Sequence, residues 1–308
     1  MRALAGGIAA GAMSVFWSAS ALAADTLGQP TNGAIDLQPG VTPLRDDAIF
    51  FHNAILMPII TAITLLVLGL LLWCVFRFNA KANPVPARWS HNTKIEVIWT
   101  LAPVLILMVI SIFSFRLLFE YHNMPPAYMT VKATGYQWYW GYEYPDQKIP
   151  EYVSNILPED QAKAKNAPYK LAATQPLVIP VNKVVKVLVT GADVIHAFAV
   201  PAFGIITDAV PGRVNETWIK ADTIGTYYGS CRELCGVDHA FMPIEVHVVS
   251  QADFDAWIAA KAPKAAAPAA AGPPPAATAA ATGTPAAATA PAAPATTTPP
   301  APPAPAAH

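Results

Sequence analysis

Two long stretches of apolar residues dominate the pattern of hydrophobic and polar positions along the chain. Residues 54–76 and residues 97–115 contain no charged side chain. A helix of about 20 apolar residues crosses the ~30 Å hydrocarbon core of a bilayer, and neither stretch has the polar face of a helix from a soluble protein. The pattern therefore predicts a hairpin of two transmembrane helices within residues 49–120.

The charges around these stretches predict which side of the membrane each end faces. The intervening loop, about residues 77–95, contains four basic side chains and no acidic one: Arg77, Lys81, Arg88 and Lys94. Cytoplasmic loops are enriched in Lys and Arg, so both ends of the hairpin are expected outside. Residues 1–24 resemble a cleaved signal peptide, with a basic start, an apolar stretch and a small-residue cleavage pattern. Residues 25–48 would then be an extracytoplasmic N-terminal segment.

From residue 121 to residue 261 the pattern changes to short runs of β-branched residues bounded by Gly, Pro, Asn or Asp, which is typical of strands. The predicted strands cover residues 131–134, 176–181, 184–190, 217–220 and 244–249. Residues 146–173 are expected to form an insertion loop with one short helix, and residues 253–260 a closing helix. Because helices and strands do not alternate, a Greek-key sandwich or barrel is favoured over a parallel sheet.

Composition supports this division. Hydrophobic residues make up 54% of the chain and charged residues only 13%, which is low for a soluble domain. Residues 262–308 are almost entirely Ala, Pro, Thr and Gly, with nothing large to bury, so a disordered tail is predicted. The formal net charge of −1 argues against a nucleic-acid-binding protein, and three Cys are too few for a disulfide framework.

The candidate chemistry is concentrated in residues 231–242, where two thiols, an imidazole and a thioether lie close together. They belong to Cys231, Cys235, His239 and Met242, and a second imidazole, His196, lies upstream. Soft and borderline donors of this kind select copper or zinc. A disulfide or a structural zinc site would leave Met242 without a role. The set therefore favours a copper pair bridged by both thiolates, with mononuclear copper, zinc and a disulfide as the alternatives.

Four motifs, taken in order, resemble the cytochrome c oxidase subunit II family. They are Tyr-Gln-Trp-Tyr-Trp at 136–140, Asp-Val-Ile-His at 193–196, Thr-Asp-Ala-Val-Pro-Gly-Arg at 207–213 and Tyr-Tyr-Gly-Ser-Cys at 227–231. The resemblance extends over roughly residues 45–260. It implies a membrane α-helical hairpin (two transmembrane helices) plus an all-β cupredoxin-like Greek-key barrel. The protein would lie in a bacterial inner membrane, with the barrel and both termini on the periplasmic side.

The resemblance also implies a cofactor and its ligands. The barrel would carry two copper ions, the mixed-valence pair called CuA. The two bridging thiolates and the two terminal imidazoles would come from Cys231, Cys235, His196 and His239. Met242 would be a weak ligand to one copper, and the backbone carbonyl of Glu233 a weak ligand to the other. The side chain of Glu233 would help to bind magnesium at the boundary with subunit I.

By the same resemblance, the chain accepts electrons from cytochrome c and passes them to haem in subunit I. There oxygen is reduced to water and protons are pumped, while this chain itself holds no oxygen-reducing centre. Subunit III and the lipid bilayer are further implied partners. Trp138 is implied as the point of electron entry, although Tyr136 stands where many relatives have His. Glu96 is implied as the entrance of a proton-uptake path.

Cytochrome c is basic at its haem edge, so its docking surface is expected to be acidic. Acidic residues outnumber basic ones by 15 to 11 between residues 120 and 261. The candidate docking residues are Asp193, Glu143, Asp146 and Asp208.

Three related classes of protein fit less well. A quinol oxidase subunit would lack the copper ligands. A nitrous oxide reductase would need a large propeller domain that 308 residues cannot hold. A free-standing periplasmic copper carrier would need neither Glu96, Trp138 nor a two-helix anchor.

Overall fold

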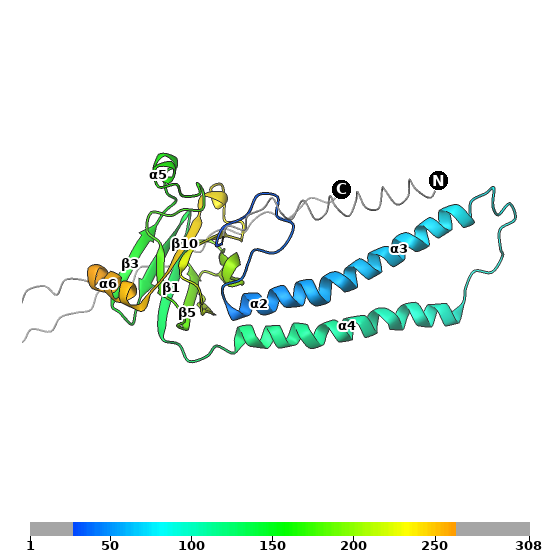
Figure 1. Ribbon diagram of the computed structural model, residues 1–308, viewed down its shortest axis with the longest axis horizontal. Helices are drawn as coiled ribbons and strands as arrows, with labels where there is room; N and C mark the ends of the chain where they lie inside the picture. Colours follow the sequence, from blue (N-terminus) through cyan, green and yellow to red (C-terminus); the bar gives the residue numbers. More distant parts are fainter. Residues whose placement is uncertain (1–26, 263–308) are drawn as a thin grey trace, which may run out of the picture. The chain divides into compact units, whose positions relative to one another are not determined.

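A computed structural model describes residues 27–262 of the 308-residue chain. The predicted signal peptide, residues 1–24, lies outside the described residues, and so does the predicted tail, residues 262–308, apart from its first residue. Both therefore stay predictions. Within the described range, two long helices come first, a β domain follows, and the short helix α6 (Gln251–Lys261) comes last (Figure 1).

The first long helix runs from Pro43 to Arg77 in three consecutive parts: α2 (Pro43–Phe50), the π-helical segment η1 (Phe51–Leu56) and α3 (Met57–Arg77). The Thr42 hydroxyl caps its start by accepting a hydrogen bond from the Arg45 N–H. The helix begins several residues before the predicted span. The apolar pattern missed this first part, because α2 is polar and carries three charged residues: Arg45, Asp46 and Asp47.

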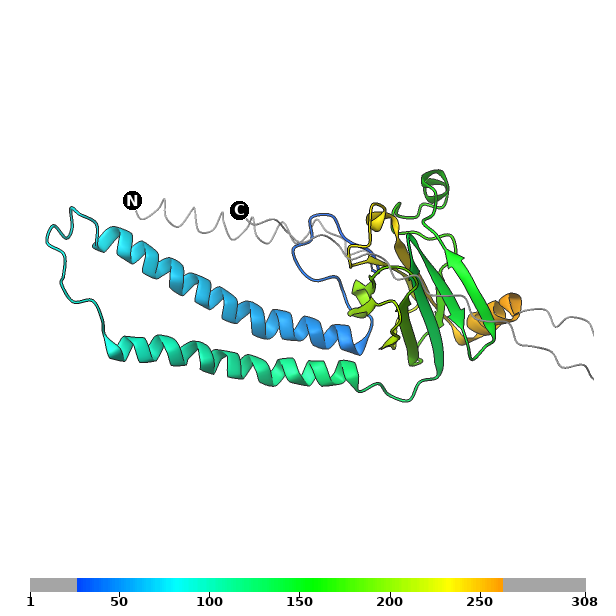
Figure 2. The same cartoon turned by 180° about the vertical axis from the view of Figure 1, so that it is seen from behind.

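The second long helix is α4 (Thr93–His122). The Asn92 side chain accepts hydrogen bonds from the N–H groups of Lys94 and Ile95, and Glu96 reaches back to the Asn92 N–H at 3.3 Å. Both long helices, seen from two sides in Figures 1 and 2, are apolar and long enough to cross a membrane. Most of their large apolar side chains are exposed, which suits contact with lipid.

The β domain consists of two five-stranded sheets. The first has the order β3-β2-β1-β5-β8 and contains β1 (Met129–Tyr136), β2 (Tyr139–Tyr144), β3 (Ile149–Ser154), β5 (Val185–Gly191) and β8 (Asn215–Ile219). The second has the order β4-β10-β9-β6-β7 and contains β4 (Leu177–Pro180), β6 (His196–Val200), β7 (Ile205–Ala209), β9 (Gly225–Cys231) and β10 (Pro243–Val249). Neighbours are antiparallel except for two parallel pairs, β1 with β5 and β4 with β10.

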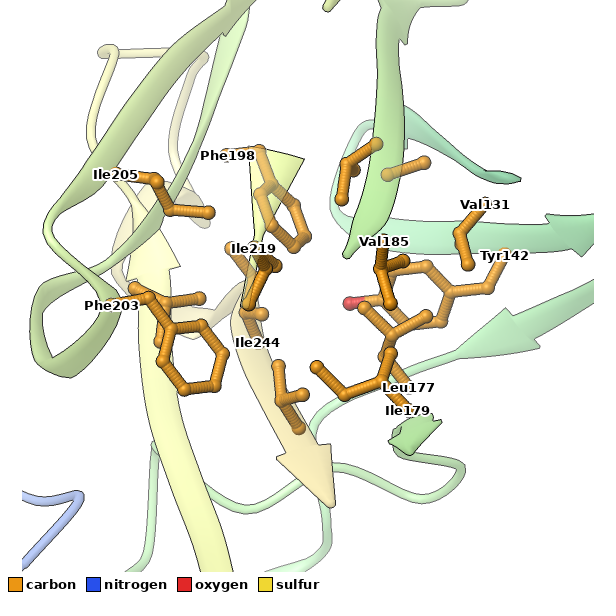
Figure 3. Packing of buried hydrophobic residues seen from close by; sticks show 14 of the residues in the cluster. Val131, Tyr142, Leu177, Ile179, Val185, Phe198, Phe203, Ile205, Ile219 and Ile244 are labelled. Carbon is orange, nitrogen blue, oxygen red and sulfur yellow. The ribbon is translucent and has the colours of Figure 1, made fainter. Parts of the chain in front are cut away.

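The core of the domain lies between the two sheets. Val131 and Tyr142 come from the first sheet, Phe198 and Ile244 from the second, and all four side chains are fully buried (Figure 3). Burying an aliphatic or aromatic side chain of this size stabilises the fold by about 1.5–3 kcal/mol. This packed core fixes the strand ends that carry the candidate site.

All five predicted strands are present, and the predicted fold class of a membrane hairpin plus a β-sandwich or barrel is confirmed. The predicted closing helix corresponds to α6, and the predicted short helix to α5 (Glu159–Ala164). Five strands were not predicted: β2, β3, β6, β7 and β9. β6 reads His-Ala-Phe-Ala-Val and is buried on both faces, so it shows no alternation, and β3 lies inside the predicted insertion loop.

Candidate metal centre

The connection between β9 and β10 holds two free thiols. Cys231 ends β9, and Cys235 lies in the loop that leads to the 3₁₀ turn η3 (His239–Phe241). Both cysteines are buried, and their Sγ atoms lie 3.9 Å apart. A disulfide bond measures about 2.05 Å. The two sulfur atoms are therefore unlinked and close enough to serve one metal centre.

Each thiol has its own imidazole neighbour. His196 opens β6 and is fully buried, with its Nδ1 atom 4.0 Å from Cys231 Sγ. His239 is half-buried in η3, with its Nδ1 atom 3.5 Å from Cys235 Sγ. The donor atoms of His196, Cys231 and Cys235 all lie within 4.8 Å of one another, and His239 is not part of that trio. The two imidazoles thus approach different sulfur atoms.

The two predicted weak ligands also lie at the loop. The backbone carbonyl oxygen of Glu233 is 3.3 Å from Cys231 Sγ, while the Glu233 residue is otherwise exposed. Met242 is buried, and its carbonyl accepts a hydrogen bond from the Cys231 N–H at 3.1 Å. This backbone bond ties the two ends of the loop together.

A carboxylate fixes the orientation of His196. Asp193 Oδ1 lies 2.8 Å from His196 Nε2, so we assign the ring proton to Nε2. The unprotonated Nδ1 then faces Cys231 with a lone pair that can bind a metal ion. The backbone N–H groups of Val194 and Gln137 also donate to Asp193. Burial has the largest single influence and opposes the charged carboxylate, but the hydrogen bonds together outweigh it and lower the pKa of Asp193. Carboxylate support of this kind is usual for histidine ligands.

Two glycines make room for the site. A Cβ atom on Gly135 of β1 would lie 2.8 Å from Cδ2 of His196, and one on Gly236 would lie 2.9 Å from Cζ2 of Trp138. Gly236 also has a φ angle of +130°, which L side chains rarely adopt. Neither glycine was singled out from the sequence, because its importance depends on which side chain crosses it in the fold.

The donor set fits a soft metal ion. Burial, followed by the influence of Cys231, raises the pKa of the Cys235 thiol to about 12, so a bound metal would displace a proton that this thiol otherwise holds. Separations of 3.5–4.0 Å between donor atoms suit neighbours around ions with bonds of about 2.0–2.3 Å. Calcium and magnesium prefer oxygen donors, whereas thiolates and imidazoles suit copper.

The turn between β1 and β2 brings Trp138 to the same loop. The Trp138 indole N–H donates to the carbonyl of Cys235 at 3.3 Å, and the Gln137 side chain donates to the same carbonyl at 2.8 Å. Trp140 is fully buried and meets the His196 ring edge-on, with ring centroids 6.1 Å apart. The predicted Trp138 and the predicted ligand loop are therefore in contact, and sequence reasoning assigned no role to the contacts of Gln137 and Trp140.

Two acidic side chains flank this turn. Asp193 does so through its bond to the turn backbone, and Glu151 of β3 accepts a hydrogen bond from the Tyr136 hydroxyl at 2.7 Å. Tyr136 in turn stacks on Tyr139, with ring centroids 4.7 Å apart. The hydrogen bond to Glu151 is the largest cause that raises the pKa of Tyr136 to about 12. Glu151 was not predicted as a site residue, because only the pairing of β2 with β3 brings it here.

The other predicted acids lie elsewhere. Glu143 forms an ion pair with Lys132 at 3.3 Å and lies toward the end of β2 that is farther from the Trp138 turn. Asp146 follows β2 and accepts a hydrogen bond from the Thr130 N–H, and Asp208 is exposed on β7. Glu96 belongs to the first turn of α4, outside the β domain. The docking and proton-uptake roles of these residues stay predictions.

Comparison with known proteins covers both parts of the chain. Residues 129–249 match the model of the family described as cytochrome c oxidase subunit II, periplasmic domain, and residues 30–117 match that of its transmembrane domain. The probable cytochrome c oxidase subunit 2 of Rickettsia felis is 47% identical over 233 residues, or 76% of this chain and 73% of the relative. The cytochrome c oxidase subunit 2 of Cereibacter sphaeroides is 44% identical over 250 residues, or 76% of this chain and 82% of the relative.

A solved structure is also similar. The crystal structure of the periplasmic domain of subunit II of cytochrome oxidase from Bradyrhizobium japonicum is 52% identical, covers 45% of this chain and 96% of its own chain, and has a TM-score of 0.42.

The fold and the site define a two-helix membrane protein whose β-sandwich carries a candidate thiol–imidazole metal centre. The chain belongs to the cytochrome c oxidase subunit II family, as the two family matches and the relatives show. It is therefore a subunit of a haem–copper cytochrome c oxidase complex. Two apolar helices and a periplasmic domain fit a two-pass membrane protein, and the family together with the His–Cys group suggests copper binding.

Proposed function

We propose that this chain holds the dinuclear CuA centre of the oxidase. The observation that carries the proposal is the thiol pair of Cys231 and Cys235, unlinked at 3.9 Å, with a different imidazole beside each sulfur. One tetrahedral ion would gather all four donors around a single point, whereas His239 lies outside the close trio. When bound, a thiolate-bridged copper pair supplies one-electron storage and release. The chain's own residues hold and orient it.

In this proposal His196 and His239 are terminal ligands, and both thiolates bridge. Met242 and the Glu233 carbonyl act as weak ligands at opposite ends of the connection between β9 and β10. The position of the Glu233 carbonyl 3.3 Å from Cys231 Sγ supports its part in this set. The exposed carboxylate of Glu233 is the candidate magnesium ligand at the boundary with subunit I, since magnesium prefers oxygen donors.

We infer that electrons enter at Trp138, from cytochrome c. The hydrogen bond from its indole to the Cys235 carbonyl joins a partly exposed aromatic ring directly to a ligand residue. Asp193 accepts a hydrogen bond from the Gln137 N–H and Glu151 one from the Tyr136 hydroxyl, so both supply negative charge near the turn that carries Trp138. They would attract the basic haem edge of cytochrome c, with Glu143, Asp146 and Asp208 as more distant members of the docking surface.

The membrane arrangement follows from the charges of the hairpin. The basic loop between α3 and α4 would face the cytoplasm, and both termini and the copper domain the periplasm. Residues 1–24 would be removed as a signal peptide. Electrons would pass on to haem in subunit I, where oxygen is reduced and protons are pumped, with subunit III as a further neighbour. Glu96, at the start of α4 on the cytoplasmic side, would open the proton-uptake path.

Electron paramagnetic resonance of the full-length chain, purified in detergent and loaded with copper, tests the dinuclear site. The expected hyperfine pattern is that of one unpaired electron shared by two equivalent copper nuclei. C231S and C235S should each abolish this pattern. C74S, which alters an exposed thiol in α3, should leave it unchanged. A pattern from a single copper nucleus would refute the copper pair.

The steady-state rate of cytochrome c oxidation by the whole complex tests the docking surface. The rate should fall as salt is raised, because salt screens exposed charges. E151Q should lower the second-order rate at low salt more than E143Q, since Glu151 is beside the Trp138 turn. Equal effects would place the centre of the dock elsewhere, and a rate insensitive to salt would rule out an acidic dock.

A further inference from the structure

Gln137 contacts both halves of the metal centre at once. Its side-chain Nε2 donates to the carbonyl of Cys235 at 2.8 Å, and its backbone N–H donates to Asp193 Oδ2 at 2.8 Å. The other oxygen of Asp193 holds His196 Nε2. A continuous series of hydrogen bonds therefore links the residue of one thiol to the imidazole beside the other thiol.

We propose that Gln137 is a positioning residue that sets the distance between the Cys235 half and the His196 half of the copper site. The proposal rests on the proposed function, because it takes these residues as copper ligands. The hydrogen bonds of Gln137 go to the Cys235 carbonyl and to Asp193, and to none of the sulfur or imidazole atoms that would bind copper. Gln137 acts through the Cys235 carbonyl and through the Asp193 carboxylate.

The loop needs such a tie because packing holds little of it. Between the buried Cys231 and Cys235, and for the residues that follow, the loop is exposed: Leu234 is 79% exposed and Val237 is 83% exposed. Segments with few buried apolar contacts move easily. Cys235 itself is buried in the core, but its exposed neighbours add little packing, so polar contacts to the β1–β2 turn help to set the position of its sulfur.

Of the two side-chain donors to the Cys235 carbonyl, Gln137 makes the shorter bond, at 2.8 Å against 3.3 Å for Trp138. Gly236 keeps this approach open, because a Cβ atom there would lie 3.1 Å from Gln137 Nε2. The bond to Asp193 comes from the backbone N–H of residue 137, so it is available in any variant at this position except proline. Side-chain variants therefore remove only the Cys235 half of the link and leave His196 supported.

The test uses the full-length chain in detergent with two substitutions and a control. Q137M keeps the length of the side chain and removes the donor, and Q137E places a carboxylate against the carbonyl. The control is Q161M, on an exposed glutamine of α5. The first readout is the rate at which copper is lost to an excess of a copper chelator. The second is amide hydrogen exchange of residues 231–242 in the copper-free protein.

Copper loss should accelerate about ten- to a hundredfold in Q137M and further in Q137E, as is usual when an outer-shell partner is lost. Exchange across residues 231–242 should rise in both variants, with the rest of the β domain and the Q161M control unchanged. Wild-type rates of copper loss and exchange in Q137M and Q137E would overturn the proposal. Exchange that rises throughout the β domain would also overturn it, because the residue would then support the fold in general.

The two proposals fail in different ways. If the wild-type chain shows no copper pair by paramagnetic resonance, the proposed function fails. If the wild-type chain shows the pair and Q137M retains copper equally well, only the role of Gln137 fails.

Discussion

The two imidazoles of the site lie in different structural surroundings. His196 opens β6, an interior strand of the second sheet. It is fully buried, is held by the Asp193 carboxylate and meets the Trp140 ring edge-on. His239 lies in a single 3₁₀ turn and is half-buried. Within residues 27–262, the only hydrogen-bonding partner of the His239 ring is Cys235 Sγ, 3.5 Å from its Nδ1 atom.

This contrast separates a rigid half of the site from an adjustable one. The His196 half is continuous with the core of the sandwich, so its geometry costs energy to change. The His239 half depends on a turn and an exposed loop, and small shifts there disturb few neighbours. A metal site on a loop keeps its geometry only where a rigid scaffold supports it. Substitutions in the His196 half should therefore have larger effects than matched substitutions in the His239 half.

The largest difference is expected between two phenylalanines, one in each half. Phe198 is fully buried and meets Trp140 edge-on at 5.3 Å, whereas Phe241 in η3 is half-buried. F198A should lower the free energy of unfolding by about 3–5 kcal/mol, because it leaves a cavity in the core. F241A should lower the free energy of unfolding by only about 1 kcal/mol, the usual size for a single substitution outside the core. Chemical denaturation in detergent, followed by tryptophan fluorescence, measures both values, and equal losses would contradict the division into two halves.

A second expected difference concerns copper retention. D193N keeps an oxygen that can accept a hydrogen bond from the Nε2–H group of His196 but removes the negative charge. Copper should be lost about ten- to a hundredfold faster, because supports of histidine ligands contribute this much to metal affinity. D208N makes the same charge change at an exposed position on β7 and should leave the rate unchanged. The release rate to a chelator distinguishes the two.

A third prediction concerns the space beside His196. G135A places a Cβ atom 2.8 Å from the ring, so the imidazole or β1 must move. Overpacking of this kind costs about 1–3 kcal/mol in the free energy of unfolding. G69A, in α3, is the control, because nothing lies within 4 Å of a Cβ atom there. If G135A is as stable as the wild-type chain, the His196 half is less rigid than the contrast requires.

The sequence was sufficient for features that follow from composition or from local spacing. The two membrane helices were evident from their uncharged stretches, and the loop of Cys231 and Cys235 from the density of soft donors. The start of the first helix was not evident from the sequence, because α2 is polar and is held by the Thr42 cap. Strands such as β6 were missed because a strand buried on both faces has no period of two.

The supports of the site were largely beyond the sequence. Asp193 was recognised as an acid near a ligand, but its bond to His196 Nε2 requires a particular turn. Gly135 and Gln137 belong to the first sheet and to the turn at its end, and they reach His196 and Cys235 only through the packing of the two sheets. Glu151 depends in the same way on the pairing of β2 with β3. Contacts between distant segments carry no local signal.

The smallest predicted effect belongs to the His239 half and sets the lower limit of the contrast. The Lys170 ammonium lies 4.7 Å from the centre of the Phe241 ring, next to the turn that holds His239. An exposed cation–π contact contributes about 0.5–1 kcal/mol, so K170M should lower the free energy of unfolding by about that amount. K170M should also accelerate copper release slightly, because the contact steadies the turn. The control K165M, at a lysine with no such contact to Phe241, should leave the release rate unchanged. A loss above about 2 kcal/mol for K170M would mean that the turn is held as firmly as the strand of His196, and the two halves would no longer differ.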